Sequence, residues 1–282
     1  MEKKQQTMQA FVLGGGGARG ALQVGALRAL LEYDFKPDLL VGTSIGALNA
    51  AAVALWGFDA AGLARMEHAW KEVANAQILD PRFAQLIIKA MVGRPSDHSR
   101  QQSLKFMKRM GVDAEMTFGD ITGIRLAVVS ADIETGQPVI YGDDASDNLM
   151  EGLLASINVP PWFQPVHRGE KIIIDGGLVS NLPIEPALRL GAENIIALDL
   201  EQPVRKKPEN LSLPDFFQKA FYAVNQRYTY LESALAEAHG VPVKVINFEG
   251  LCPYPIWDFS HHRELIGAGY EQAVGKLETW KR

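Results

Sequence analysis

The stretch Gly42-Thr43-Ser44-Ile45-Gly46 decides how this sequence is interpreted. It follows a short apolar run at residues 39–41 and precedes a run of small and apolar residues at 47–54. This order predicts a strand, a tight turn and a helix, in which the serine of G-x-S-x-G occupies a strained corner with its hydroxyl clear of the backbone. The flanking glycines lack a Cβ, so strand and helix can approach closely. The sequence therefore predicts that Ser44 is a nucleophile.

A serine before a helix can also be an N-cap that accepts a backbone N–H. Capping accounts for Ser44 and for Gly42, but it does not account for Gly46. Glycine inside the first turn of a helix costs about 1 kcal/mol relative to alanine. The nucleophile is the favoured interpretation.

A second motif, Gly14-Gly15-Gly16-Gly17-Ala18-Arg19-Gly20, follows a predicted buried strand at residues 8–13. Helical spacing of apolar residues predicts that a helix continues from it to about residue 33. Glycines at a helix start expose backbone N–H groups at the positive end of the helix dipole and so form an anion site.

This predicted anion site has two possible interpretations. Gly15, Gly17 and Gly20 fit the G-x-G-x-x-G dinucleotide motif, with Asp34 or Asp38 at the distance of a ribose-binding acid. Alternatively, the loop is an oxyanion hole that stabilises charge on an ester carbonyl. No Gly-Lys-Ser/Thr follows, which excludes a phosphate-binding P-loop. The nucleophile motif in the next strand–helix unit favours the oxyanion hole.

The oxyanion donors are predicted among the backbone N–H groups of Gly15, Gly16, Gly17 and Ala18, with Gly16 and Gly17 first. Arg19 is predicted to hold the loop or a lipid phosphate through its guanidinium. The alternative is a solvated residue in the first helical turn.

A third motif lies far along the chain, where Asp175-Gly176-Gly177 follows the β-branched run Lys171-Ile172-Ile173-Ile174. Asp-Gly is a common turn pair, so Asp175 alone is best explained as a turn residue. Together with Ser44 and the glycine loop, it is better explained as a carboxylate placed at the end of a strand for catalysis.

These motifs resemble those of the bacterial patatin-like phospholipases. The glycine loop, Gly42–Gly46 and Asp175-Gly176-Gly177 match three family blocks, and Ala155-Ser156-Ile157-Asn158-Val159-Pro160 matches the A-S-x-x-x-P segment. The resemblance extends from about residue 11 to residue 200. It implies a three-layer α/β/α fold with a mainly parallel central sheet, and hydrolysis of lipid acyl esters. It also implies a Ser44–Asp175 dyad, with Asp175 as general base and no metal or cofactor.

Catalysis is therefore predicted to need no histidine. A conventional triad of nucleophile, acid and histidine would place several strands before the nucleophile motif, and this chain has room for only two. The sequence contains six histidines: His68, His98, His167, His239, His261 and His262.

Length and composition predict one hydrolase domain over residues 1–282, with further helices and a last strand at 215–282. The net charge of −5 argues against nucleic acid as a partner. The N-terminus is too short and charged for a signal sequence, and no apolar run approaches the roughly 18 residues of a membrane span. The single cysteine, Cys252, is compatible with a reducing cytoplasm. We expect a cytoplasmic protein, and the sequence makes no prediction of its oligomeric state.

Three segments are candidates for contact with the inner face of a membrane. Residues 83–92 are apolar around much of a helix and are best explained as core, although an acyl-chain wall or a lid is the alternative. Arg205-Lys206-Lys207 lies in a predicted linker, where an ordinary exposed loop is favoured. Residues 251–259 carry aromatic residues between prolines, and the sequence does not choose between an interfacial and an ordinary loop. A non-catalytic lipid-binding regulator remains a third functional alternative.

Overall fold

The computed structural model describes residues 7–76, 98–160, 162–202, 213–251 and 254–281. The predicted segments 83–92 and Arg205–Lys207, and Cys252, lie outside these residues.

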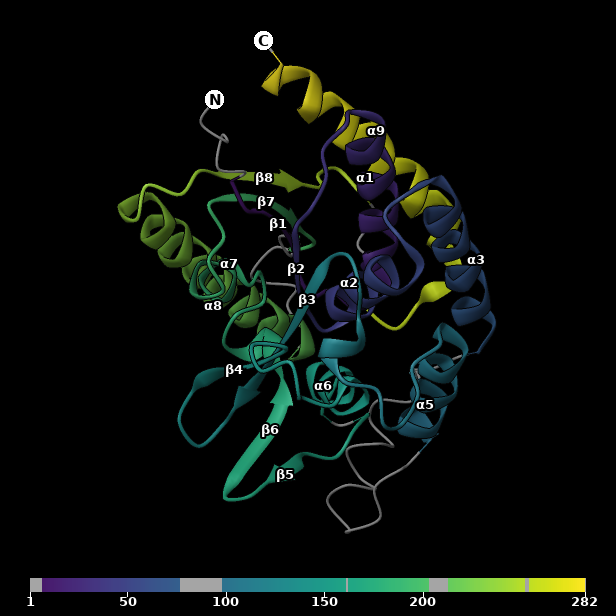
Figure 1. The fold of residues 1–282 in the computed structure, drawn as a ribbon, viewed down its shortest axis with the longest axis vertical. Helices are drawn as coiled ribbons and strands as arrows, with labels where there is room; N and C mark the ends of the chain where they lie inside the picture. Colours follow the sequence, from purple (N-terminus) through teal and green to yellow (C-terminus); the bar gives the residue numbers. More distant parts are fainter. Residues whose placement is uncertain (1–6, 77–97, 161, 203–212, 252–253, 282) are drawn as a thin grey trace.

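One mixed sheet runs through the molecule in the order β5-β6-β3-β2-β1-β7-β8, with β4 paired to β3 (Figure 1). Strands β3, β2, β1, β7 and β8 are parallel, whereas β4 and β6 run antiparallel to β3, and β5 runs antiparallel to β6. The strands are β1 (Gln9–Leu13), β2 (Leu39–Thr43), β3 (Arg125–Asp132), β4 (Gln137–Tyr141), β5 (Val166–Arg168), β6 (Lys171–Asp175), β7 (Asn194–Asp199) and β8 (Val243–Asn247).

Helices cover both faces of the sheet (Figure 1). One face carries α1 (Ala21–Glu32), α2 (Ile45–Trp56), α3 (Ala60–Ala76), α5 (His98–Met110), α6 (Leu149–Ser156) and α9 (His262–Trp280). The other face carries α7 (Ile184–Arg189) and α8 (Leu213–Ala238). The three-layer α/β/α fold with a mainly parallel sheet is confirmed. None of the helices in the described residues combines the length and apolarity needed to cross a membrane.

Alternating residues of the central strands divide the interior into two cores. In β1, Phe11 and Leu13 face the α1 side, whereas Ala10 and Val12 face the α7 side. This alternation follows from the two-residue period of a strand, and both sets are fully buried because helices cover both faces. The larger core lies under α1, which packs along the C-terminal helix α9.

The element predictions largely hold. Residues 124–130, 138–141, 194–200 and 243–248 correspond to strands β3, β4, β7 and β8, and β4 is the expected antiparallel neighbour of β3. The glycine loop differs from the prediction, because its second half, Gly17–Gly20, forms a short 3-10 helix, η1, before α1 begins at Ala21.

Candidate active site

Ser44 occupies a strained corner between β2 and α2. Its φ of 56° and ψ of −125° place a non-glycine residue at positive φ, which is rare and costs on the order of 1–3 kcal/mol. Gly46 makes the corner possible, since a Cβ there would overlap the carbonyl oxygen of Leu13 and lie 2.7 Å from that of Gly14. Ser44 occupies the N-cap position of α2, but its side chain makes no capping hydrogen bond, so the prediction that the serine caps the helix through its hydroxyl is wrong.

The backbone of this corner is held from α6. Ser44 N–H donates to Ser156 Oγ at 3.0 Å, and the Ser156 hydroxyl donates to the carbonyl oxygen of Val129 at 2.6 Å. Ser156 is fully buried and belongs to the A-S-x-x-x-P segment, whose role the sequence did not reveal. Its hydroxyl therefore bridges the serine corner and Val129 of β3.

Asp175 is the last residue of β6 and lies beside Ser130 of the antiparallel neighbour β3. It is only 8% exposed, and burial raises the pKa of its carboxyl group from 3.8 to about 6, an effect that the nearby Ser44 hydroxyl and the Gly177 N–H partly offset. Gly177 N–H donates to Oδ1 at 2.7 Å, so Asp175 also caps its turn as the sequence suggested. Oδ2 has no hydrogen-bond partner of standard geometry among the described residues.

The glycine loop packs directly against Ser44. A Cβ on Gly15 would lie 3.2 Å from Ser44 Cβ. Two of the four candidate oxyanion donors are already engaged, because Gly15 N–H donates to Asn181 O at 3.0 Å and Ala18 N–H donates to Ile256 O at 2.8 Å. Gly16 and Gly17 donate to no backbone oxygen in the part of the chain that the structure describes. The oxyanion prediction therefore narrows to Gly16 and Gly17.

Four further glycines of the three motifs lie at close approaches. A Cβ on any of them would come within 3.0 Å of a neighbouring atom; they are Gly20, Gly42, Gly176 and Gly177. Gly176, for example, lies against Val129 O and Thr43 Cγ2. The Asp175 turn therefore packs against the backbone of β3 and the side chain of Thr43, the residue before Ser44.

Asn181 connects the glycine loop to the Asp175 turn, and the sequence analysis missed it. Its carbonyl accepts from Gly15 N–H, and its Nδ2 donates to Gly15 O at 3.4 Å and to Glu201 Oε1 at 2.9 Å. A Cβ on Gly177 would lie 2.9 Å from Asn181 Oδ1. One side chain thus touches the loops that carry both predicted functions.

Arg19 is partly buried beside the acidic side chains of Asp199 and Glu201 rather than fully solvated. Its Nε donates to Gly16 O at 3.3 Å, and burial lowers the pKa of its guanidinium while Glu201 and Asp199 oppose that change. Burial also raises the pKa of Asp199 to about 6. Of the roles considered for Arg19, the contact with Gly16 supports holding the loop.

Buried polar side chains brace the glycine loop from the helical side. Gln23 Nε2 donates to Gly14 O at 2.8 Å, and Asn49 Nδ2 donates both to Gly20 O and to Gln23 Oε1 at 2.9 Å. Trp70 Nε1 donates to Asn49 Oδ1 at 3.1 Å. Polar residues within the apolar segments of α1 and α2 were the sequence signal for this network.

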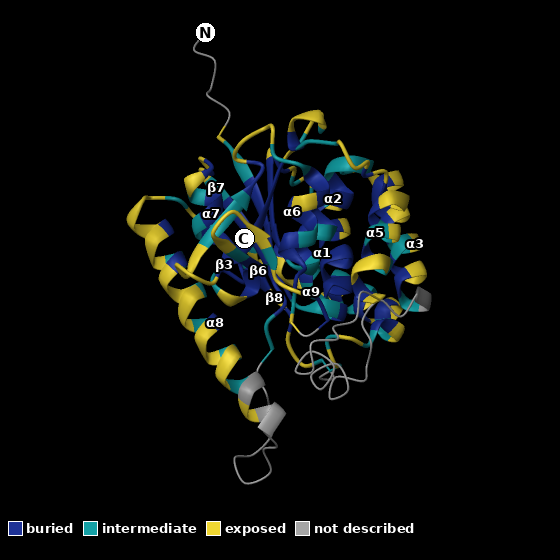
Figure 2. Ribbon diagram, turned by 90° about the horizontal axis from the view of Figure 1, so that it is seen from below, coloured by how far each residue is buried: buried dark blue, intermediate teal, exposed yellow. Residues whose placement is uncertain are grey.

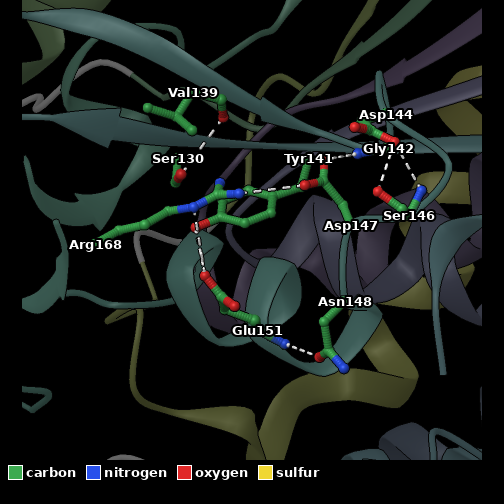
Figure 3. Close-up of polar contacts among 10 residues, drawn as sticks. All are labelled: Ser130, Val139, Tyr141, Gly142, Asp144, Ser146, Asp147, Asn148, Glu151 and Arg168. Atoms are coloured by element: carbon green, nitrogen blue, oxygen red, sulfur yellow. Dashed lines mark hydrogen bonds and ion pairs between the residues drawn. The ribbon is translucent and has the colours of Figure 1, made fainter. Parts of the chain in front are cut away.

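The β5–β6 hairpin that carries Asp175 is tied to α6 and β4 (Figure 3). Arg168 lies 4.9 Å above the Tyr141 ring and pairs with Asp147 at 3.4 Å and Glu151 at 3.8 Å. Burial raises the pKa of Tyr141 to about 12, and Glu151 adds to the rise. The same helix, α6, ends at Ser156, whose hydroxyl accepts from Ser44 N–H. Helix α6 therefore contacts both the hairpin that carries Asp175 and the corner that carries Ser44.

Three of the histidines contact residues other than Ser44 and Asp175. His68 pairs with Glu72, His261 with Asp258 and Glu264, and His262 Nδ1 contacts Phe259 O. In the described residues no group of three or more His, Cys, Asp or Glu side chains could hold a metal ion.

The described part of the 251–259 loop packs onto the glycine loop. Ile256 accepts from Ala18 N–H, and its backbone and Cβ would collide with any side chain at Gly17, where φ is +57°. Trp257 is 37% exposed and lies 6.1 Å from the Trp162 ring. This loop therefore forms a wall beside the candidate oxyanion donors.

The fold and the site define an α/β protein with a serine at a strand–helix corner, a buried carboxylate and a glycine loop. The sequence profile of the patatin-like phospholipases matches residues 11–188. The chain belongs to the patatin-like phospholipase family.

Curated relatives agree with this assignment. The chain is 30% identical over 196 residues to an NTE family protein of Mycobacterium tuberculosis, covering 68% of this chain and 30% of the relative. It is 30% identical over 193 residues to patatin-like phospholipase domain-containing protein 7 of Rattus norvegicus, covering 68% and 13%. It is 26% identical over 293 residues to lysophospholipase nte1 of Aspergillus terreus, covering 96% and 18%.

The chain therefore spans less than a third of the length of these relatives. Among solved structures, VipD from Legionella pneumophila is similar with a TM-score of 0.47 at 16% identity, covering 97% of this chain and 67% of that one.

Proposed function

We propose that this protein is a serine hydrolase that cleaves acyl esters of lipids through a Ser44–Asp175 dyad. The observation that carries the proposal is the position of Ser44, strained and uncapped, beside a buried carboxyl group whose pKa is raised to about 6. A general base works best when its pKa lies near the working pH, and an ordinary aspartate near 3.9 would be too weak. Burial thus supplies the basicity that a dyad without histidine requires.

In the first half of the reaction, Ser44 Oγ bonds to the ester carbonyl carbon while Asp175 takes the hydroxyl proton. The carbonyl π electrons move to the oxygen, and the N–H groups of Gly16 and Gly17 stabilise this oxyanion. When the oxyanion collapses, the C–O bond to the alcohol breaks, and protonated Asp175 gives its proton to the leaving alkoxide. The product is an acyl-Ser44 ester.

Water completes the cycle. Asp175 takes a proton from the attacking water, whose oxygen bonds to the acyl carbon, and the same donors hold the second oxyanion. Collapse breaks the bond to Ser44 Oγ, which regains its proton, and the fatty acid leaves. None of these steps uses a metal or a cofactor.

The nucleotide-binding alternative is less well supported by the geometry. In a dinucleotide site the glycine loop opens directly into an α-helix whose free N–H groups face the pyrophosphate. Here η1 intervenes, Gly15 and Ala18 are engaged, and a Cβ on Gly16 would lie 2.8 Å from Leu200 Cβ. Family membership supports a lipid acyl ester as the substrate class.

A fluorophosphonate probe tests the proposal directly. We expect covalent labelling of the wild-type protein and no labelling of Ser44→Ala, with both proteins folded by circular dichroism. A folded wild-type protein that resists the probe would contradict the hydrolase and favour a nucleotide-binding module or a lipid-binding regulator. Equal labelling of wild type and Ser44→Ala would place the nucleophile elsewhere.

A further inference from the structure

Two side chains hold the peptide units that carry the proposed oxyanion donors. Asn181 Nδ2 donates to Gly15 O at 3.4 Å. Arg19 donates to Gly16 O at 3.3 Å through its Nε and also through its backbone N–H. In a planar trans peptide the N–H points away from the C=O of the same unit. The contact on the Gly15 oxygen therefore fixes the direction of Gly16 N–H, and the contact on the Gly16 oxygen fixes that of Gly17 N–H.

The Glu201 carboxylate determines which end of the Asn181 amide faces the glycine loop. Its Oε1 accepts from Asn181 Nδ2 at 2.9 Å, so the amide nitrogen lies between two acceptors, this carboxylate oxygen and Gly15 O. A side-chain amide carries both of its donors on the nitrogen, and its oxygen only accepts. If the amide turned over, its oxygen would face both acceptors and neither hydrogen bond could form. Glu201 therefore holds the amide in the orientation that binds the loop.

The carboxylate of Glu201 is itself held by its surroundings. Its Oε1 also accepts from Asn225 Nδ2 at 3.0 Å, and Glu201 N–H donates to Asp199 Oδ1 at 2.9 Å. Figure 2 shows mostly exposed residues along α8, the helix that carries Asn225, but Asn225 is only 1% exposed. Glu201 is thus fixed both by α8 and by the end of β7.

The same carboxylate acts on Arg19 through its charge. Burial lowers the pKa of the Arg19 guanidinium, and Glu201 opposes this change more than Asp199 does. A charged donor makes a stronger hydrogen bond than a neutral one, so the carboxylate supports the contact of Arg19 with Gly16 O. Glu201 therefore acts on both peptide units, by a hydrogen bond through Asn181 and by charge through Arg19.

We propose that Glu201 is a positioning residue of the oxyanion hole. Its carboxylate fixes the Asn181 amide, and this amide keeps Gly16 N–H directed at the oxyanion. Glu201 touches no substrate atom in this role and acts only through the glycine loop. The inference rests on the proposed function, because the direction of these donors matters only if an oxyanion forms.

Steady-state kinetics on a soluble p-nitrophenyl ester test the inference. We expect Glu201→Ala to lower kcat about ten-fold with little change in KM, because the lost contact acts on the transition state. Glu201→Gln keeps an oxygen that can accept from Asn181 Nδ2 and should retain most of the wild-type kcat. Glu201→Asp keeps the charge but is one methylene shorter, so it should lose kcat as Glu201→Ala does. Glu201→Asp also serves as the test if Glu201→Ala does not fold.

Asn225→Ala is the matched control. Asn225 donates to the same Glu201 oxygen as Asn181 does, but among the described residues it has no hydrogen bond to the glycine loop. Its kcat should stay within about two-fold of wild type. Equal losses of kcat in Asn225→Ala and Glu201→Ala would show that Glu201 matters only for packing against α8, and would overturn the inference.

A double-mutant cycle tests whether Glu201 acts through Asn181. The variant with both Glu201→Ala and Asn181→Ala should lose little more than the roughly ten-fold of each single variant, whereas independent effects would multiply to about a hundred-fold. Independent effects, or a wild-type kcat in Glu201→Asp, would overturn the positioning role and leave the dyad intact. A wild-type protein that neither hydrolyses the ester nor reacts with the fluorophosphonate probe would refute the proposed function and this inference with it.

Discussion

Replacing Asp175 by asparagine should abolish turnover and at the same time change how stability depends on pH. The folded protein holds the Asp175 proton up to about pH 6, whereas the unfolded chain holds it only to about 3.8. Between these values the unfolded state binds fewer protons, so the free energy of unfolding of the wild type falls as pH rises. This loss is complete above about pH 6.

The size of the effect follows from the two pKa values. The difference between 3.8 and about 6 corresponds to about 3 kcal/mol at 1.36 kcal/mol per pH unit. Part of this is already lost at pH 4, so the stability of Asp175→Asn relative to wild type should rise by about 2.5 kcal/mol between pH 4 and pH 8. Asparagine cannot ionise, and its Oδ1 can still accept from Gly177 N–H.

Denaturant unfolding of both proteins at several pH values measures this difference. Other buried carboxyl groups with a raised pKa, those of Asp199 and Glu232, titrate in both proteins and cancel. Asp34→Asn is a control for the same substitution at an exposed site, where the side chain is 88% exposed. The wild-type kcat/KM should rise with pH through an apparent pKa of about 6. Parallel stability curves for wild type and Asp175→Asn across this range would refute the raised pKa.

Three further changes test the rest of the site. Gly17→Val, whose side chain would collide with Ile256 O, should lower kcat by about 10²-fold or more in a folded protein, and a normal kcat with loss of nucleotide binding would favour the dinucleotide alternative. Asn181→Ala should lower kcat about ten-fold on a soluble ester with little change in KM, because it removes a contact that positions Gly15; a change in KM alone would contradict this. Each of the six His→Gln variants should keep most of the wild-type activity, whereas one that matches the Ser44→Ala defect without unfolding would replace the dyad by a triad.

The sequence predicted the parts of this structure that depend on neighbouring residues. The strand–serine–helix order around Ser44 and the strand before Asp175 are local patterns, and both have the expected secondary structure. The alternation of buried residues in β1 and its parallel neighbours likewise follows from local apolar runs. The 3-10 turn at Gly17–Gly20 was missed because Ile256, far along the chain, binds Ala18 N–H and fixes the loop.

Contacts between distant segments were beyond the sequence. Nothing near residue 175 indicates that β6 runs antiparallel to β3, because its direction depends on the β5–β6 hairpin and the Arg168 contacts. Asn181 and Glu201 are ordinary polar residues in the chain. They become part of the site only because the fold brings them to the glycine loop.

The strain at Ser44 and the burial of Asp175 both oppose folding, and both serve the proposed chemistry. The serine corner costs on the order of 1–3 kcal/mol, and the buried carboxylate costs about 3 kcal/mol at neutral pH. The surrounding network offsets these costs without removing them, because Ser156 holds the Ser44 N–H and Gly177 holds one Asp175 oxygen. The second oxygen is left without a standard hydrogen bond. Strain at the serine and a raised pKa at the neighbouring carboxyl group are both what the proposed dyad requires, since the serine hydroxyl has to be accessible and the base has to accept its proton.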